Sequence, residues 1–122
     1  MLDNKQLGNW GENIAVGHLK KNKYKIIAQN WQNKWGEIDI IAKKKKTLVF
    51  VEVKTTKKQI EFSPTDKIDY KKQKQLVKMA QIYLSSNKIS LEIPYQIDVI
   101  AIELFSGETK ITHLQNVLED NF

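Results

Sequence analysis

The sequence contains no cysteine and no arginine, and each absence excludes a class of site. Without cysteine there are no disulfides, zinc-thiolate centres or cysteine nucleophiles, a composition compatible with a reducing cytosol. Without arginine, all twenty basic residues are lysines, which bind phosphate as point charges and lack the planar fork that reads guanine edges. The first residues are polar, and no apolar run is long enough to span a membrane. We therefore expect a cytoplasmic protein that does not enter a membrane.

Length and charge indicate one basic domain. A chain of 122 residues suits a single domain, residues 1–122, that buries a core without metal or disulfide staples. The first 60 residues carry 13 lysines against 5 acidic residues, whereas the remainder carries 7 lysines against 9. A basic half around an acidic pocket suits a polyanion whose scissile phosphate meets a metal, although a lysine-rich surface also serves solubility alone.

The most informative stretch is residues 35–54. Two short apolar, β-branched segments, 35–42 and 47–54, flank a run of four lysines that is too polar for anything but a turn. The pattern predicts a β-hairpin with its turn centred between Lys45 and Lys46. In that register the charged residues of the two strands oppose one another in pairs.

These opposed pairs carry the candidate chemistry. Asp39 is expected opposite Glu52 and Glu37 opposite Lys54, with all four side chains on one face of the hairpin. Like charges directly opposite each other cost roughly 0.2–1 kcal/mol, and burial among apolar side chains adds to that cost. A divalent cation would offset it, because Mg²⁺ commonly binds one or two carboxylates together with water and substrate phosphate. A surface hairpin with a solvated Glu37–Lys54 ion pair is the simpler alternative.

Asp39 followed by Glu52-Val53-Lys54 on a paired strand resembles the core of the PD-(D/E)xK, or restriction-endonuclease-like, superfamily. More widely, the chain resembles the YraN-like (UPF0102) family of small bacterial proteins proposed to be endonucleases. The matching segments are Gly11-Glu12-Asn13-Ile14-Ala15, Asn30, residues 36–42, residues 49–54, Lys72-Gln73 and Ile97-Asp98-Val99. The resemblance covers nearly the whole chain and implies an α/β fold, with a central mixed β-sheet and flanking helices around the acidic cluster.

The resemblance also implies metal-dependent hydrolysis of phosphodiester bonds. Asp39, Glu52 and Glu12 would hold Mg²⁺ or Mn²⁺, and Lys54 would orient or activate the attacking water or stabilise charge on the phosphate. By its own sequence context, Glu12 is more typical of a solvated helix residue. The candidate contacts to nucleic acid, with DNA favoured over RNA, are Lys34, Lys57, Lys58, Lys72 and Gln73. The positions where the family tends to carry arginine hold Gln29, Gln32, Lys34, Thr56 and Gln96, so a bidentate phosphate grip is not expected there.

Hydrophobic periodicity predicts the remaining elements. Before the hairpin, it predicts a helix over Asn4 to Asn22, capped by Asp3 or Asn4, and a strand over Tyr24 to Trp31, closed by a turn at Asn30. After the hairpin, it predicts a loop from Thr55 to Ser63 and a helix from Pro64 or Thr65 to about Asn87. The last two elements are a covered strand from Ile93 to Leu104 and a strand from Thr109 to Leu114.

Five further side chains have open roles. Asp98 interrupts the covered strand, and as a buried carboxylate it needs a partner, for which Lys54, Lys72 or backbone amides are candidates. His18 and His113 are interpreted as boundary and edge residues. Trp31 and Trp35 flank a basic turn and are candidates for stacking on unpaired bases, with core packing expected for at least one of them.

Two other function classes remain open. One is a non-catalytic module that keeps the nuclease-like fold and clamps DNA or RNA, and the other is a basic scaffold or ribosome-associated protein. The intact Asp39 and Glu52-Val53-Lys54 set favours an enzyme, because a pure binder gains nothing from carboxylates that face phosphate. Nuclease domains of this size often work in pairs, so a homodimer is among the expected partners.

Overall fold

The computed structural model describes residues 3–57, 70–90 and 92–118. This part of the chain forms a five-stranded mixed sheet with two helices, in agreement with the predicted α/β class and consistent with a restriction-endonuclease-like core. The elements are α1 (Asn4–Lys21), β1 (Lys25–Asn33), β2 (Gly36–Lys44), β3 (Thr47–Thr56), α2 (Tyr70–Ser86), β4 (Tyr95–Phe105) and β5 (Glu108–Leu114). The predicted loop after β3 and the predicted start of the second helix lie largely in residues 58–69, outside the described residues.

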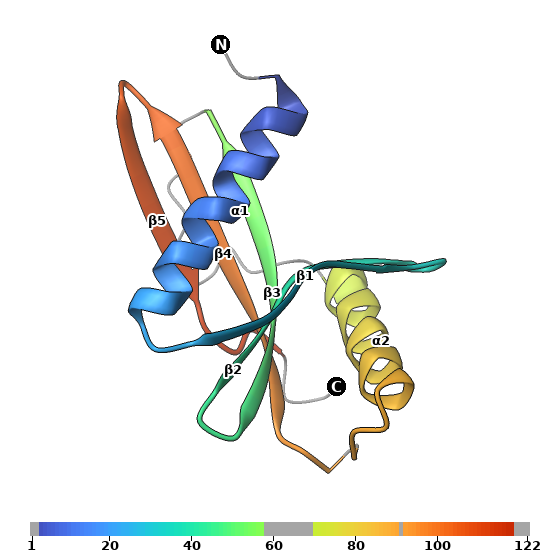
Figure 1. Ribbon diagram of the computed structural model, residues 1–122. Helices are drawn as coiled ribbons and strands as arrows, with labels where there is room; N and C mark the ends of the chain where they lie inside the picture. Colours follow the sequence, from blue (N-terminus) through green and yellow to red (C-terminus); the bar gives the residue numbers. More distant parts are fainter. Residues whose placement is uncertain (1–2, 58–69, 91, 119–122) are drawn as a thin grey trace.

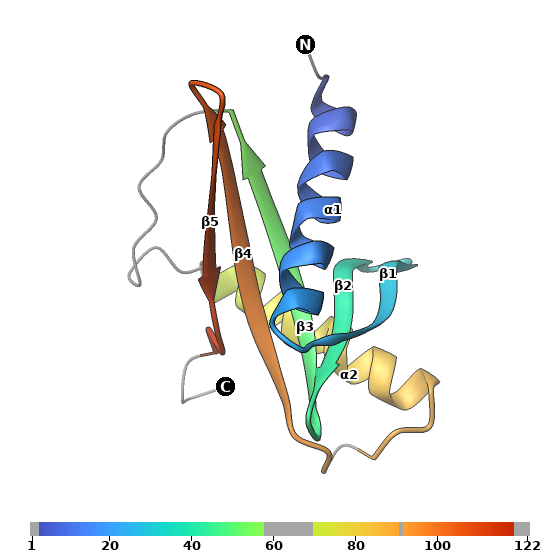
Figure 2. The same ribbon diagram turned by 60° about the vertical axis from the view of Figure 1, so that its left-hand side comes forward.

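The sheet keeps the order of the chain. Its strands follow one another as β1-β2-β3-β4-β5, and only the β3–β4 pair is parallel. A parallel connection needs a crossover, and α2 lies within it. The two helices therefore cover opposite faces of the sheet, α1 on one side and α2 on the other (Figures 1 and 2). Neither described helix is long and apolar enough to cross a membrane.

The start of α1 is fixed by a capping box. The Asp3 carboxylate accepts a hydrogen bond from the Gln6 backbone N–H at 2.8 Å, and the Gln6 side chain accepts one from the Asp3 backbone N–H at 2.9 Å. This reciprocal pair satisfies amides that the first helical turn leaves without partners. Of the two predicted caps, the structure therefore selects Asp3.

The sheet buries one apolar cluster under each helix. On the α1 side, Ala15 and Leu19 pack against Ile40, Val51 and Ile100. The cluster on the α2 side is built around Phe50, Leu76, Met79, Tyr83 and Ile97. Because β3 and β4 lie inside the sheet and are covered on both faces, both of their faces are apolar, as predicted for the fourth strand.

Glycine lets α1 lie directly against β3. A Cβ added at Gly11 would lie 2.9 Å from both Cβ and Cγ2 of Thr55, which is closer than carbon atoms approach without repulsion. The absence of a side chain at Gly11 allows this close approach of the helix to the sheet, and it places Glu12 beside β3.

We expect Gly11→Ala to destabilise the protein by roughly 1–3 kcal/mol, because the new methyl group overpacks the contact with Thr55. Gly17→Ala is the matched control, since a Cβ there meets nothing within 4 Å. Alanine at an open helical position should stabilise the protein by roughly 0.5–1 kcal/mol relative to glycine. Urea denaturation of both variants measures the difference. Equal effects at the two positions would show that helix propensity, not the contact, decides.

Candidate active site

The hairpin register is as predicted, and it ends at the acidic cluster. Pairing runs from Lys44 opposite Thr47 to Ile40 opposite Val51. Beyond that pair the Asp39 carboxylate takes the place of a backbone acceptor, because its Oδ2 accepts the Val53 N–H at 2.8 Å. Here the far ends of β1 and β2 turn away from β3 (Figure 1). Asp39 therefore sits where the two strands of the hairpin separate.

The neighbouring strand β1 does not close at Asn30 as predicted. It continues to Asn33, and the turn that follows is at residues 34–35. Asn30 has a φ of 52°, a left-handed conformation that asparagine adopts more readily than most residues. The register passes from Gln29 opposite Ile40 to Trp31 opposite Ile38, which places Asn30 across from Asp39.

Three carboxylates converge on one cavity between α1 and the hairpin. The cavity has a volume of about 350 Å³ and is lined by Asn4, Leu7, Gly8, Glu12, Glu37, Asp39, Val53 and Thr55. The Glu12 Oε1 atom is buried and has no hydrogen-bond partner among the described residues. A buried carboxylate oxygen without a donor is costly, so the cavity is suited to a cation or to water bound by one.

Glu52 and Lys54 leave β3 on the side opposite this cavity. They alternate along the strand with Val53 and Thr55, which line the cavity. The Glu52 carboxylate instead lies 3.6 Å from the Lys72 ammonium on α2. The Glu37 carboxylate accepts a hydrogen bond from Gln32 Nε2 at 2.8 Å, and among the described residues it forms no ion pair with Lys54.

The prediction that all four charged side chains share one face is therefore wrong. It assumed strict alternation along both strands, and β2 does not keep it. Ile38 packs into the cluster on the α2 side, whereas Ile40, two residues on, packs into the cluster on the α1 side. The alternation shifts between them, which turns Asp39 toward α1 while Glu52 stays on the α2 side.

The electrostatics reflect this crowding of negative charge. Burial raises the pKa of Asp39 to about 7; the hydrogen bond from Val53 opposes the rise, and Glu52, Glu12 and Glu37 add to it. Burial also raises the pKa of Glu12, with a further contribution from Glu37. For Glu52 burial again raises the pKa, although Lys72 and Lys54 act against it. Ionising all of these groups is costly in the protein alone.

The described residues of the cavity can hold a divalent cation only if water or substrate completes its coordination shell. Within the described ranges, no three acidic or histidine side chains are arranged as a metal-binding group. The predicted three-carboxylate set of Asp39, Glu52 and Glu12 is thus not assembled, because Glu52 lies on the other side of β3. Mg²⁺ nevertheless commonly binds at sites with one or two carboxylates, where water and substrate oxygen complete the coordination shell.

A family model covers the segment that carries these residues. Residues 11–102 match the model of the uncharacterised protein family UPF0102. The chain belongs to the UPF0102 family. It is 40% identical to a UPF0102 protein of Caldicellulosiruptor bescii over 119 residues, which cover 97% of this chain and 98% of that protein. A UPF0102 protein of Alkaliphilus oremlandii is 40% identical over 114 residues, covering 93% and 97% of the two chains. One of Herpetosiphon aurantiacus is 37% identical over 119 residues, covering 94% and 95%.

The predicted nucleic-acid contacts of this UPF0102 chain differ in their placement. Lys34 and Lys57 are exposed, whereas Lys72 is held by Glu52. Gln73 is only 2% exposed, which conflicts with the prediction that it contacts nucleic acid. It lies on the inner face of α2, where helical periodicity directs it toward the sheet. Lys58 lies outside the described residues.

A buried polar cluster around Asp98 was not predicted. Asp98 is fully buried, and its Oδ1 accepts hydrogen bonds from Gln96 Nε2 at 2.8 Å and from the Asn116 N–H at 2.9 Å. Its Oδ2 lies 2.7 Å from His113 Nε2 and accepts the Tyr24 hydroxyl at 3.3 Å. Of the predicted partners, the backbone amide is right and the lysines are wrong. Burial and the nearby Asp98 raise the pKa of Tyr24 to about 12.

The same cluster joins α1 to the edge of the sheet. His18 Nε2 lies 3.0 Å from His113 Nδ1, so the two histidines pair across 95 residues of sequence. Burial lowers the pKa of His18, with smaller contributions from His113 and Lys21. The sequence offered no signal for this contact, because neither histidine lies in a motif with the other. In this UPF0102 chain the contact ties the C-terminal half of α1 to β5.

Proposed function

We propose that this chain is a metal-dependent nuclease that hydrolyses phosphodiester bonds in nucleic acid. The observation that carries the proposal is the cavity in which Glu12, Glu37 and Asp39 converge at the separation of β2 and β3, with a buried Glu12 oxygen that lacks a partner. Such a cluster is unfavourable in the protein alone, and a divalent cation bridging to phosphate would offset its cost. The lysine-rich first half of the chain supplies the positive surroundings that a polyanion needs.

Each side chain has a distinct role in this proposal. Asp39 would hold Mg²⁺ or Mn²⁺ from the cavity, with Glu12 adding negative charge from the α1 side. Glu52 would reach the cation from the other side of β3 once Lys72 releases it. The cation, when bound, supplies Lewis-acid stabilisation of the charge that develops on the scissile phosphate. Lys54 follows Glu52 at the spacing that sends both side chains to one side of β3. From there its ammonium can orient the attacking water or stabilise the phosphate oxygens.

The Glu52–Lys72 ion pair favours a second candidate, a nucleic-acid-binding module without catalysis. A carboxylate held by a lysine at 3.6 Å is partly neutralised and so less available to a metal. In the nuclease, Lys72 would have to release Glu52 as the cation binds. In the binding module, the ion pair would persist and the basic surface alone would hold the phosphates.

A cleavage screen separates the two candidates. Single-stranded, duplex, flap and four-way-junction DNA, together with RNA, are incubated with Mg²⁺, with Mn²⁺ or with EDTA. Glu52→Gln, purified in the same way, is the control for contaminating nucleases. We expect cleavage that requires metal and is lost in Glu52→Gln. Binding without cleavage of any substrate, or equal cleavage by the variant, would overturn the nuclease proposal in favour of the binding module.

A further inference from the structure

Trp35 is the exposed tryptophan of this protein. Its side chain is 49% exposed, whereas the Trp31 ring packs edge-on against Tyr83 with centroids 5.4 Å apart, and Trp10 packs against the cluster on the α1 side. Of the two roles open to Trp35 from the sequence, core packing is thereby excluded. A broad aromatic face at the surface can stack on a second flat ring once the lysine side chain over that face moves aside.

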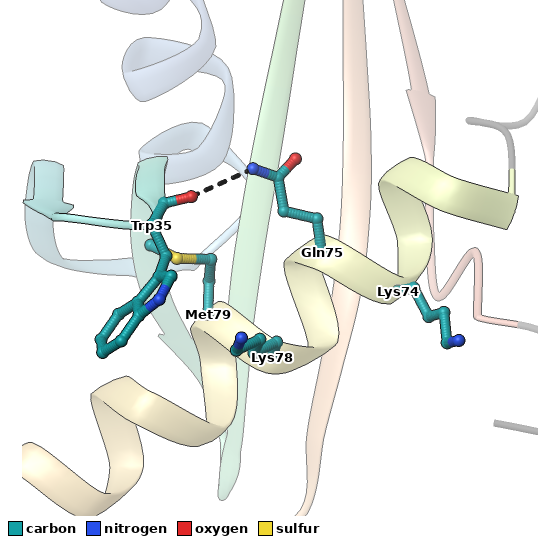
Figure 3. Close-up of a pocket in the computed structure, with 5 residues that line it drawn as sticks. All are labelled: Trp35, Lys74, Gln75, Lys78 and Met79. Carbon is teal, nitrogen blue, oxygen red and sulfur yellow. Dashed lines mark hydrogen bonds between the residues drawn. The ribbon is translucent and has the colours of Figure 1, made fainter.

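The backbone of Trp35 is anchored on both sides. Its N–H donates to the Asn33 side-chain oxygen at 2.8 Å, and its carbonyl accepts from Gln75 Nε2 of α2 at 3.3 Å. The close-up in Figure 3 shows the indole projecting from this anchor beside Met79 and Lys78. The ring is therefore held in place between the β1–β2 turn and α2, so that little conformational freedom is lost when a ligand stacks on it.

Lysines surround the ring. The ammonium of Lys34 lies 4.6 Å from the ring centroid and that of Lys78 lies 5.4 Å from it, both within the range of a cation–π contact. Among the described residues, the lining of a hollow of about 370 Å³ consists of Trp35, Lys74, Gln75, Lys78 and Met79, none of which is acidic. An aromatic face beside several ammonium groups matches the alternation of base and phosphate in a nucleic-acid strand.

The hollow and the carboxylate cavity each share a lining residue with the same neighbouring depression. A second depression, of about 450 Å³, runs from Lys34 and Trp35 to Glu37, and Glu37 also lines the cavity of Asp39. Trp35 precedes Asp39 by four residues, a distance of about 13 Å along an extended chain. That length corresponds to roughly four stacked nucleotides.

We infer that Trp35, with Lys34 and Lys78, is a stacking site for an unpaired base of the strand that reaches the carboxylate cavity. A base inside a duplex has both faces covered by its neighbours, so it cannot stack on the indole. The ligand is therefore a single strand or the single-stranded end of a larger nucleic acid. The inference rests on the proposed function in placing that strand's phosphates at Asp39; the stacking itself does not require cleavage.

Binding is measured by fluorescence anisotropy in EDTA, so that no strand is cut. The probes are a labelled 20-nucleotide oligo(dT), the same backbone with abasic sites at every position, a 20-base-pair duplex and oligo(U). We expect Trp35→Ala to weaken binding of oligo(dT) about 5- to 100-fold, the range that loss of one stacked base gives. The affinities for the abasic strand and the duplex should change less than two-fold, and Trp35→Phe should retain most of the single-strand affinity.

Ile111→Ala is the matched control, because it removes another exposed apolar side chain from β5, at the opposite edge of the sheet. It should leave all affinities unchanged, and thermal melts confirm that each variant is folded.

An equal loss of affinity for oligo(dT) and the abasic strand in Trp35→Ala would overturn the stacking site, as would no loss at all. A loss confined to strands with bases would support it even if the protein cleaves nothing, in which case only the nuclease proposal fails. Comparison of oligo(dT) with oligo(U) identifies whether DNA or RNA is the preferred source of the base.

Discussion

Replacing Asp39 with asparagine is expected to stabilise the metal-free protein and to abolish metal-dependent cleavage. The carboxylate lies in a site that raises its pKa to about 7, chiefly through burial and further through Glu52, Glu12 and Glu37. Asparagine removes the charge but keeps a side-chain oxygen that can accept the Val53 N–H, as the carboxylate does at 2.8 Å. At pH 8 we expect a gain of roughly 1–3 kcal/mol in the free energy of unfolding, allowing for partial solvent screening.

The gain should depend on pH in a definite direction. The pKa of Asp39 is near 7 in the folded protein and near 3.8 when unperturbed. Between these values the folded state binds the proton and the unfolded state does not, so this group favours folding increasingly as pH falls from 8 toward 5. Asparagine has no such dependence. The advantage of Asp39→Asn should therefore be largest at pH 8 and clearly smaller at pH 5, and it should vanish only below the unfolded pKa of 3.8.

Metal should reduce the stability advantage of Asp39→Asn over the unmutated protein. A cation that binds only the folded state at ten times its dissociation constant adds about 1.4 kcal/mol, or several degrees in Tm for a domain of this size. Thermal melts at pH 8, with EDTA and with Mg²⁺ or Mn²⁺, should show this shift in the unmutated protein and not in Asp39→Asn. If metal shifts both proteins equally, or neither, Asp39 is not a ligand and the binding-module candidate takes precedence.

Replacing Lys54 with alanine is expected to reduce cleavage by at least 100-fold while changing nucleic-acid affinity only a few-fold. A positioned group that activates water or stabilises a phosphate oxygen contributes about 10²–10⁴-fold to the rate. One exposed phosphate contact among many lysines contributes much less to affinity. The loss should fall on kcat rather than on KM, because the interaction is assigned to the transition state.

Lys110→Ala is the control for Lys54→Ala. It removes the same charge from an exposed position on β5, away from the cavity, and should leave both cleavage and binding nearly unchanged. Single-turnover cleavage and anisotropy in EDTA measure the two quantities separately. Equal loss of both in Lys54→Ala would assign the residue to phosphate binding, and unchanged cleavage would exclude it from the chemistry.

Features with a local cause were predictable from the sequence. The four-lysine turn fixed the hairpin register, because its polarity left only one place for the chain to reverse. The apolar spacing of α1 and the two apolar faces of β4 likewise predicted a capped helix and an inner strand. The identities of Asp39, Glu52 and Lys54 as candidates came from the same hairpin.

Other features were decided by packing between distant segments. Whether Asp39 shares a face with Glu52 depends on a shift in the alternation of β2, and that shift has no signature in the pattern of side chains. The burial of Gln73, the exposure of Trp35 and the contact between His18 and His113 depend on how the helices lie on the sheet. The sequence by itself determined the order of the elements, the register of the hairpin and the charged residues it carries. Only the tertiary structure decided which of those charges meet, because strand twist and helix docking bring together residues that no local interaction connects.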